Sequence, residues 1–220
     1  MNMSTTSITE GSVVSAELPT RERIMNEAAE LFARQGYHGT TTREIADAVG
    51  IRQPSLFHHF AMKGSIVTAL LDWDLDLALP RVYAIAELPQ SPAVRLYRYL
   101  LSDVTHLATA PFNLSGVYTE EIMGSPEFAS RARRRDELHD VVEGIIREGI
   151  DLGHFVAVDT NMIRHAIGGV LVRVITIHSG GRGTAATLAD QIARLFVRGL
   201  LRDTGELDGV IREATANGRP

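Results

Sequence analysis

The chain has 220 residues, 45% of them hydrophobic and 22% charged, which suffices for one substantial domain or for a small domain joined to a larger one. No apolar run approaches the roughly 18 residues of a membrane-spanning helix, and the first residues lack the features of a signal peptide, so we expect a cytoplasmic protein. A count of zero cysteines excludes disulfides and thiolate metal sites, and a net charge of -5 argues against a nonspecific nucleic-acid binder.

The first predicted helix follows a polar N-terminal stretch, residues 1–19, which we expect to be a disordered tail. Ile24, Ala28 and Phe32 then recur at the spacing of one helical face and predict a helix over 20–35. A glycine follows directly and is expected to end this helix.

Two short helices joined by a glycine-containing turn are predicted next. Thr41 and Glu44 have the spacing of a capping box, in which each side chain bonds to the backbone amide of the other residue. Gly50 easily takes the left-handed conformation that ends a helix, and a second helix should start near Arg52, with Pro54 tolerated in its first turn. This arrangement predicts a helix-turn-helix, whose second helix lies in the major groove of DNA.

The second of these helices carries more polar side chains than a buried helix would need. Arginine suits guanine and glutamine suits adenine through paired hydrogen bonds, while hydroxyls and amides at the start of the first helix suit phosphate. Leu56 and Phe60 lie four residues apart and are candidates for the core face. The alternative is a solvated polar helix in an ordinary helical domain. The residues that we predict to contact DNA are Thr41, Thr42, Arg43, Arg52, Gln53, Ser55, Leu56, His58, His59 and Lys63.

Four segments match a known pattern at the correct spacing: Phe32-Ala-Arg-Gln-Gly36-Tyr37, Thr41-Thr42-Arg43-Glu44-Ile45-Ala46, Val49-Gly50-Ile51 and Leu56-Phe57-His58-His59-Phe60-Ala-Met-Lys63. Through them, residues 20–66 resemble the DNA-binding domain of the TetR family of bacterial transcriptional regulators. Phe57 replaces the tyrosine usual in that family, which typically contacts phosphate, and Gly64 replaces an acidic residue. The resemblance implies a repressor that binds a palindromic operator as a dimer and is released by a small-molecule effector.

The remainder of the chain is expected to be helical throughout, because no alternating strand pattern of useful length occurs. A long apolar helix should run over 65–79, with Pro80 kinking or ending it. The basic run Arg131, Arg133, Arg134 and Arg135 is interpreted as a solvated helix face. Further helices are expected over 91–110, 117–123, 126–152, 160–179 and 184–203, with a glycine-rich linker over 179–183 and a fraying C-terminal tail over 204–220.

The last two long helices are apolar on more than one side and must be covered accordingly. Burial inside a single subunit is one explanation. The resemblance implies another, since TetR-family proteins dimerise through a four-helix bundle made by these helices, and a twofold dimer suits a helix-turn-helix. The residues that we predict at the dimer interface are Ile163, Ile167, Val170, Val174, Ile177, Leu188, Ile192, Leu195, Phe196 and Gly199.

The resemblance also implies a ligand pocket inside the larger helical domain. Polar or aromatic groups within apolar helices are the candidates to line it, although such groups are more often satisfied core residues. A hydrophobic or aromatic effector is expected, because pockets bind mainly through apolar area. The candidates for effector binding are Trp73, Tyr99, Asp103, His106, Phe112, Tyr118, Glu121, Met123 and Arg173.

We therefore expect an all-α protein, with a three-helix helix-turn-helix domain over 20–64 followed by a helical effector-binding and dimerisation domain over 65–203. No catalytic motif, metal-ligand helix or phosphate-binding glycine loop is present, so we expect neither an enzyme, a metal site nor a cofactor. The alternative function is a helix-turn-helix protein without an effector, or an activator.

Overall fold

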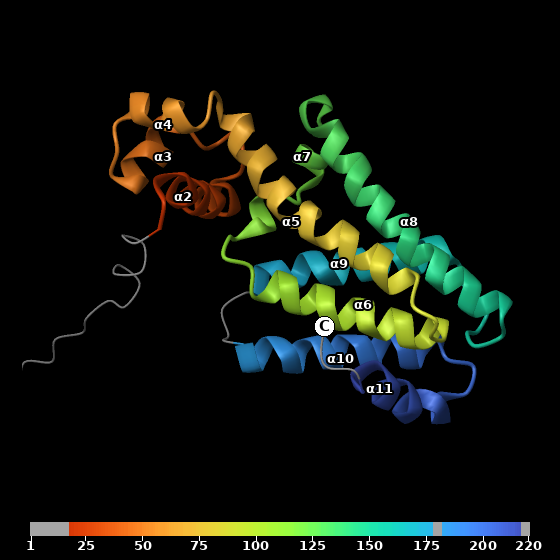
Figure 1. Cartoon of the computed structure of the whole chain (residues 1–220). Helices are drawn as coiled ribbons and strands as arrows, with labels where there is room; N and C mark the ends of the chain where they lie inside the picture. The colour runs from red at the N-terminus through yellow and green to blue at the C-terminus, as the bar shows by residue number, and fades with distance from the viewer. Residues whose placement is uncertain (1–17, 178–181, 217–220) are drawn as a thin grey trace, which may run out of the picture.

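The structure, a computed structural model, describes residues 18–177 and 182–216. A small N-terminal bundle, α2 to α4, stands at one end of a larger helical domain, and α5 runs from one into the other (Figure 1). The tail expected over 1–19 and the linker expected over 179–183 lie mostly outside the described residues. The elements are α2 Thr20–Gln35, α3 Thr42–Val49, α4 Gln53–His59, α5 Lys63–Ala86, α6 Pro92–Ala108, η1 Leu114–Gly116, α7 Glu120–Met123, η2 Pro126–Phe128, α8 Ala129–Asp151, α9 Thr160–Ile177, α10 Arg182–Leu200, η3 Thr204–Glu206 and α11 Leu207–Thr215.

The capping box predicted for the start of α3 is confirmed. The Glu44 amide donates to Thr41 Oγ1 at 3.2 Å, and the Thr41 amide donates to Glu44 Oε2 at 2.8 Å. Gly50 ends α3 in the left-handed conformation, with φ 76° and ψ 32°, as predicted. The following residues can therefore turn back, and α4 starts one residue after Arg52.

The core of the N-terminal bundle holds α4 by one face only. Leu56 and Phe60 are 0% and 3% exposed, and they pack in the core that includes Phe32 of α2 and Ile45 of α3. Arg23 of α2 adds a hydrogen bond from its guanidinium to the last carbonyl of α3. Among the described residues the other face of α4 is exposed, which is the condition for insertion into a groove.

Helix α5 is longer than predicted, because it continues through Pro80 to Ala86. Pro80 is solvent-exposed, so water can satisfy the carbonyl of Asp76 that its missing amide leaves unbonded. Leu79 and Val82, both buried, hold the helix to the core on either side of the proline. The helix therefore does not end at Pro80.

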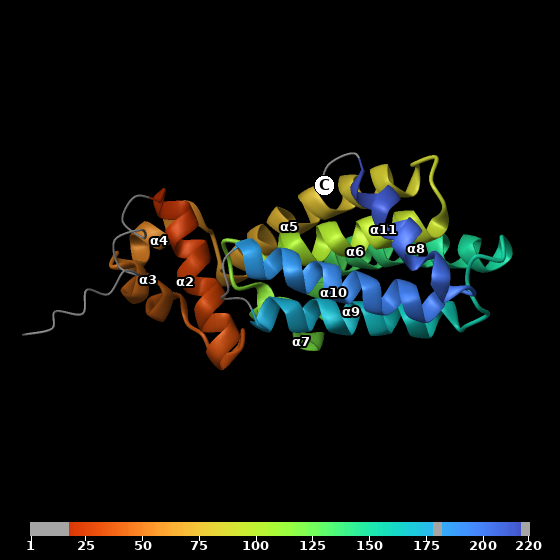
Figure 2. The same ribbon diagram turned by 90° about the horizontal axis from the view of Figure 1, so that it is seen from below.

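The larger domain is built around α6, which is buried along most of its length. Helices α5, α8, α9, α10 and α11 pack against it (Figures 1 and 2). Ser91 caps its first turn, and Pro92 occupies a position where the helix needs no amide. No helix among the described residues has the length and apolar character to cross a membrane.

Two expectations for the C-terminal half are corrected. The residues expected as a fraying tail form α11, which buries Val210 and Ala214 and receives a 3.0 Å hydrogen bond from Arg98 of α6 to the Ala214 carbonyl. Of the helix expected over 117–123, only the last four residues are helical, as α7, and a turn separates them from η1.

The basic run on α8 does not form the solvated face expected from the sequence. Arg131 and Arg134 both pair with Asp72 of α5, with closest distances of 2.8 Å and 3.2 Å, and Arg134 also pairs with Asp76 at 2.6 Å. These ion pairs join α8 to α5, and they leave Arg135 on the side of the helix that borders a cavity.

Candidate functional site

The exposed face of α4 carries several of the residues predicted to contact DNA. Arg52, His58 and His59 are exposed, and Ser55 is half-buried. Gln53 donates from Nε2 to Thr42 Oγ1 at 2.8 Å, which fixes the start of α4 against the start of α3. At the start of α3, Thr41 and Arg43 are also exposed. The N-terminal bundle therefore presents polar side chains from the starts of α3 and α4 and from the outer side of α4, where Phe57 is also exposed.

Leu56 and Lys63 do not fit the predicted contacts. Leu56 is completely buried and has no surface to offer to DNA. Lys63 Nζ donates to the carbonyls of Tyr37 and Thr40 at 2.5 Å and 2.6 Å, and it lies 4.3 Å from the centre of the Tyr37 ring. Its ammonium group therefore joins the start of α5 to the turn after α2, so the structure favours a structural role over a phosphate contact.

We expect Lys63→Met to lower the free energy of unfolding by about 1–3 kcal/mol, because two carbonyls lose their donor. The salt dependence of DNA binding should stay as it is in the wild type. Arg43→Ala, at a side chain that is 82% exposed, should instead leave stability unchanged and lower the slope of log affinity against log salt by about one. Urea unfolding and DNA binding at several salt concentrations would check both. A reduced salt slope for Lys63→Met would contradict the structural role.

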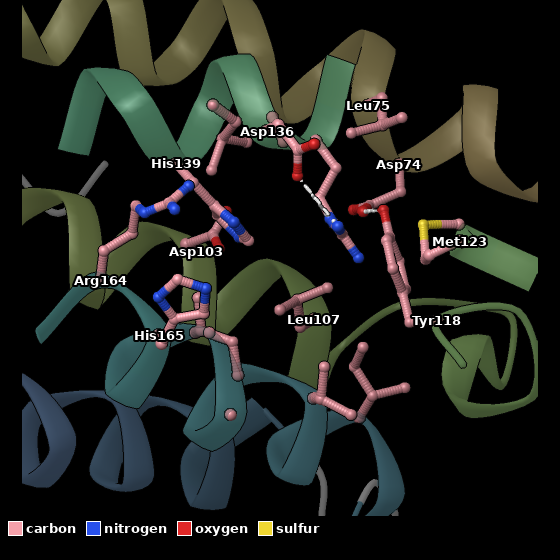
Figure 3. A pocket seen from close by; sticks show the side chains of 18 of the residues that line it. Asp74, Leu75, Asp103, Leu107, Tyr118, Met123, Asp136, His139, Arg164 and His165 are labelled. Carbon is pink, nitrogen blue, oxygen red and sulfur yellow. Dashed lines mark hydrogen bonds and ion pairs between the residues drawn. The ribbon is translucent and has the colours of Figure 1, made fainter. Parts of the chain in front are cut away.

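A cavity of about 990 Å³ lies in the larger domain, between α5, α6, α7, α8 and α9 (Figure 3). Its volume falls at the upper end of the range typical of small-molecule sites. Trp73 and Phe112 pack beside it, and His106 stacks on Trp73 with ring centres 5.1 Å apart. Of the predicted effector-binding residues, four line the cavity: Tyr99, Asp103, Tyr118 and Met123. The prediction is wrong for the other five, which do not line the cavity: Trp73, His106, Phe112, Glu121 and Arg173.

Two carboxylates and two phenols form what we call the acid–tyrosine cluster: Asp74, Tyr99, Asp103 and Tyr118. Asp74 Oδ1 lies 2.7 Å from His106 Nε2, and its Oδ2 accepts a hydrogen bond from Tyr118. Asp103 Oδ1 accepts from Arg81 at 2.8 Å, whereas the one donor to its Oδ2 among the described residues is Tyr99, at a long 3.4 Å.

Burial dominates the electrostatics of this cluster. It raises the pKa of Asp103 above its usual range, an effect that the neighbouring Arg81 guanidinium opposes. Burial and the nearby aspartates raise the pKa of Tyr99 and Tyr118 well above the ordinary value. Both phenols are therefore neutral donors at neutral pH.

A second group, the basic cluster, comes from two other helices: Arg135 and His139 from α8, and Arg164 and His165 from α9. Figure 3 shows His139, Arg164 and His165 on one side of the cavity and Asp74 and Tyr118 on the other. Sequence reasoning missed all four. Arg135 belongs to a run that was interpreted as solvated, and the other three belong to no recognisable motif.

The two arginines of the basic cluster are paired with carboxylates of α8. Arg135 pairs at 2.9 Å with Asp136, whose side chain is 53% exposed, and Arg164 lies 3.5 Å and 3.4 Å from Asp140 and Glu143. Nε of Arg164 is buried and lies 3.4 Å from Glu143 Oε2, but it forms no hydrogen bond in the part of the chain that the structure describes. Burial, with Arg135 and Arg164 nearby, lowers the pKa of His139 to about 4, so this imidazole is neutral at neutral pH.

Residues 112–128, which we call the connecting segment, join the cavity to the N-terminal bundle. Tyr118 and Met123 of this segment line the cavity. Gly116 lies directly on α2, where an added Cβ would approach the backbone of Phe32 and Ala33 to 2.4 Å. The connecting segment therefore lines the cavity and also packs against α2, the first helix of the N-terminal bundle.

Charged contacts tie the connecting segment to the same bundle. Glu121 lies 3.0 Å from His38, in the turn after α2. Glu127 fills the space over Gly64, where an added Cβ would lie 1.8 Å from its carboxylate oxygen. The glycine that departs from the family pattern therefore gives room for a contact between the two parts of the molecule.

The outer faces of α9 and α10 are apolar in part. Met162, Val172 and Leu195 are 58%, 39% and 68% exposed. Of the ten residues predicted at a dimer interface, Leu195 and Gly199 are exposed, while Ile163, Val170, Leu188 and Phe196 are half-buried. The prediction is wrong for Ile167, Val174 and Ile192, which are at most 9% exposed because they face the core of their own subunit. The side chain of Ile177 is outside the described residues.

Comparisons with known proteins match the chain over most of its length. The model of bacterial regulatory proteins of the tetR family matches residues 24–70, and that of the tetracyclin repressor-like C-terminal domain matches residues 89–200. The transcriptional repressor KstR2 of Mycobacterium tuberculosis is 27% identical over 188 residues, 83% of this chain and 94% of that protein.

Solved structures show the same fold. AmtR of Mycobacterium smegmatis is 28% identical, with a TM-score of 0.71 over 93% of this chain and 97% of that one. The ketosteroid transcriptional regulator KstR2 of Mycobacterium tuberculosis is 25% identical, with a TM-score of 0.74 over 84% of this chain and 96% of that one.

Proposed function

The chain belongs to the TetR family of bacterial regulatory proteins, and we propose that it represses transcription from a palindromic operator until a small organic molecule enters the cavity and releases it. Membership makes it a helix-turn-helix transcriptional regulator. The polar face of α4 supports sequence-specific contacts in the major groove. The exposed apolar groups on α9 and α10 support a homodimer, which a palindromic operator requires.

The observation that carries ligand control is the connecting segment. A ligand in the cavity would contact Tyr118 and Met123, and the same segment packs Gly116 against α2. A ligand can shift a conformational equilibrium only by the difference between its affinities for the two states. Coupling energies of about 1–3 kcal/mol are typical of such systems and would change DNA affinity by about 5- to 150-fold.

The proposed recognition of the DNA base sequence by α4 can be tested separately. Arg52→Ala should cost about 1–3 kcal/mol of binding free energy on the preferred DNA sequence and relax the preference at one base pair. Arg133→Ala, at an exposed arginine of α8, is the matched control and should leave affinity unchanged. Fluorescence anisotropy on a set of single-base variants of the operator would measure both. Equal losses on all duplexes would assign Arg52 to a phosphate instead of a base.

The proposed control by a ligand is tested with the operator duplex bound to purified protein. Small organic molecules are added one at a time, and anisotropy follows release of the labelled duplex. We expect at least one compound to weaken operator binding in the wild type and to lose this effect when Gly168, which lines the cavity, is replaced with Trp. A compound that acts equally on Gly168→Trp would show that release does not depend on the cavity.

A further inference from the structure

We propose that the effector is an organic acid that carries a hydrogen-bond donor, such as a hydroxyl group, on a largely apolar body. The inference rests on the proposed function, because it specifies the ligand of the same cavity. It differs from the hydrophobic or aromatic molecule expected from the sequence, since the lining carries carboxylates and arginines besides its apolar side chains.

The acid–tyrosine cluster requires a donor from the ligand. Arg81, Tyr99 and Tyr118 all direct their hydrogens to the two carboxylates, and His106 faces Asp74. The oxygens of both phenols retain lone pairs, because a hydroxyl that donates can still accept. Oδ2 of Asp103 retains one as well, since Tyr99 is its one donor among the described residues. A ligand group that only accepts hydrogen bonds would find no donor here, whereas a hydroxyl or amine would find several acceptors.

The basic cluster favours an anion. Arg135 and Arg164 face one cavity from neighbouring helices, and their counter-ions Asp136 and Asp140 have side chains 53% and 72% exposed, in contact with water. Arg164 Nε is a buried donor that makes no hydrogen bond among the described residues, although Glu143 Oε2, in a side chain that is 14% exposed, lies 3.4 Å away. A carboxylate or phosphate would supply that acceptor and would bind through charge-assisted hydrogen bonds.

Apolar side chains line the rest of the cavity and determine the character of the ligand body. Leu75 and Ala78 of α5, Leu107 of α6 and Leu171 and Ile175 of α9 contribute no polar groups. The ligand therefore needs polar groups for both clusters and an otherwise apolar body. A uniformly hydrophobic molecule would leave the buried polar groups of both clusters without partners.

The experiment uses two matched probe series, one flexible and one rigid. Each series contains a hydroxy acid, the acid without the hydroxyl and the methyl ester of the hydroxy acid. The parent compounds are 12-hydroxydodecanoic acid and lithocholic acid, and a phosphate ester of 1,12-dodecanediol distinguishes phosphate from carboxylate. Trp73, the one tryptophan of the chain, reports occupancy by fluorescence, because it stacks on His106, which contacts Asp74 in the cavity wall.

We expect at least one hydroxy acid or the phosphate ester to bind with a Kd below about 1 mM. Removal of either the hydroxyl or the charge should weaken binding by about tenfold or more. Arg164→Gln should abolish the preference for the acid over its ester, and Arg133→Gln, outside the cavity, should retain it. Tyr99→Phe should reduce the preference for the hydroxyl, whereas Tyr83→Phe, at an exposed phenol bonded to Glu137, should not.

The outcomes separate the ligand class from the control of DNA binding. A hydroxy acid that changes Trp73 fluorescence but leaves operator affinity unchanged would support the ligand class and contradict the proposed regulation. Equal binding of acid and ester, or of hydroxylated and unhydroxylated acid, would overturn the ligand class. So would the failure of both hydroxy acids and the phosphate ester to bind at about 1 mM.

Discussion

Leu195→Glu should convert the protein to a monomer and lower operator affinity by roughly 10²- to 10⁴-fold, the range expected when two linked contacts become one. Leu195 is 68% exposed on the outer face of α10, and Met162 and Val172 of α9 are likewise exposed, at 58% and 39%. A charge at this position would be desolvated in a helix-to-helix interface but hydrated in a monomer. Light scattering at micromolar concentration gives the mass, and anisotropy gives the operator affinity.

Leu152→Glu is the matched control for this variant. Leu152 is 62% exposed at the end of α8, outside the faces of α9 and α10. It should leave both the dimer and the operator affinity unchanged. If Leu195→Glu remained dimeric with unchanged operator affinity, the interface would have to lie elsewhere on the molecule.

Leu56→Ala should lower the free energy of unfolding of the N-terminal bundle by about 2–5 kcal/mol, the range observed for large-to-small substitutions in protein cores. Leu56 is 0% exposed and is the side chain that holds the middle of α4 to the core. DNA binding should be lost together with the fold of the bundle. Thermal unfolding followed by circular dichroism measures the change.

Phe57→Ala, at the next position, is the control for Leu56→Ala. Phe57 is 44% exposed, so its removal should change stability by less than about 0.5 kcal/mol, as is usual at the surface. If Leu56→Ala were as stable as the wild type but failed to bind DNA, Leu56 would contact DNA, as the sequence suggested.

The parts of the fold that could be predicted depend on local interactions. The capping box of Thr41 and Glu44 and the left-handed Gly50 involve residues within a few positions of each other, so their spacing in the sequence suffices. The same holds for the proline and serine at the start of α6. The rule that a proline ends a helix failed at Pro80, because this proline lies on the exposed face of α5. Water can bond there to the carbonyl that the missing amide leaves free.

The parts that could not be predicted depend on contacts between distant segments. Lys63 matches a family position for DNA contact, yet its ammonium group lies between carbonyls that are 23 and 26 residues earlier in the chain. Arg135 lies in a run whose members pair with α5, face the cavity or face solvent according to their phase on α8. One sequence does not reveal that phase.

The apolar stripes of α9 and α10 illustrate a related difficulty. Periodicity indicates which residues share a face, but a helix that is apolar on two sides does not reveal which side faces its own subunit. Ile167 and Val174 face inward, while Val172 on the same helix is exposed. To predict the interface, one would therefore have to know how α9 and α10 pack against α6.

The most direct test is selection of the protein's preferred DNA from a random duplex library, followed by anisotropy on the selected and a scrambled sequence. The proposed function predicts a twofold-symmetric sequence, with half-sites separated by about one helical turn or a multiple of it. It also predicts that a ligand of the cavity lowers affinity for this sequence. Enrichment of no sequence, or of an asymmetric one bound by a single chain, would contradict the account.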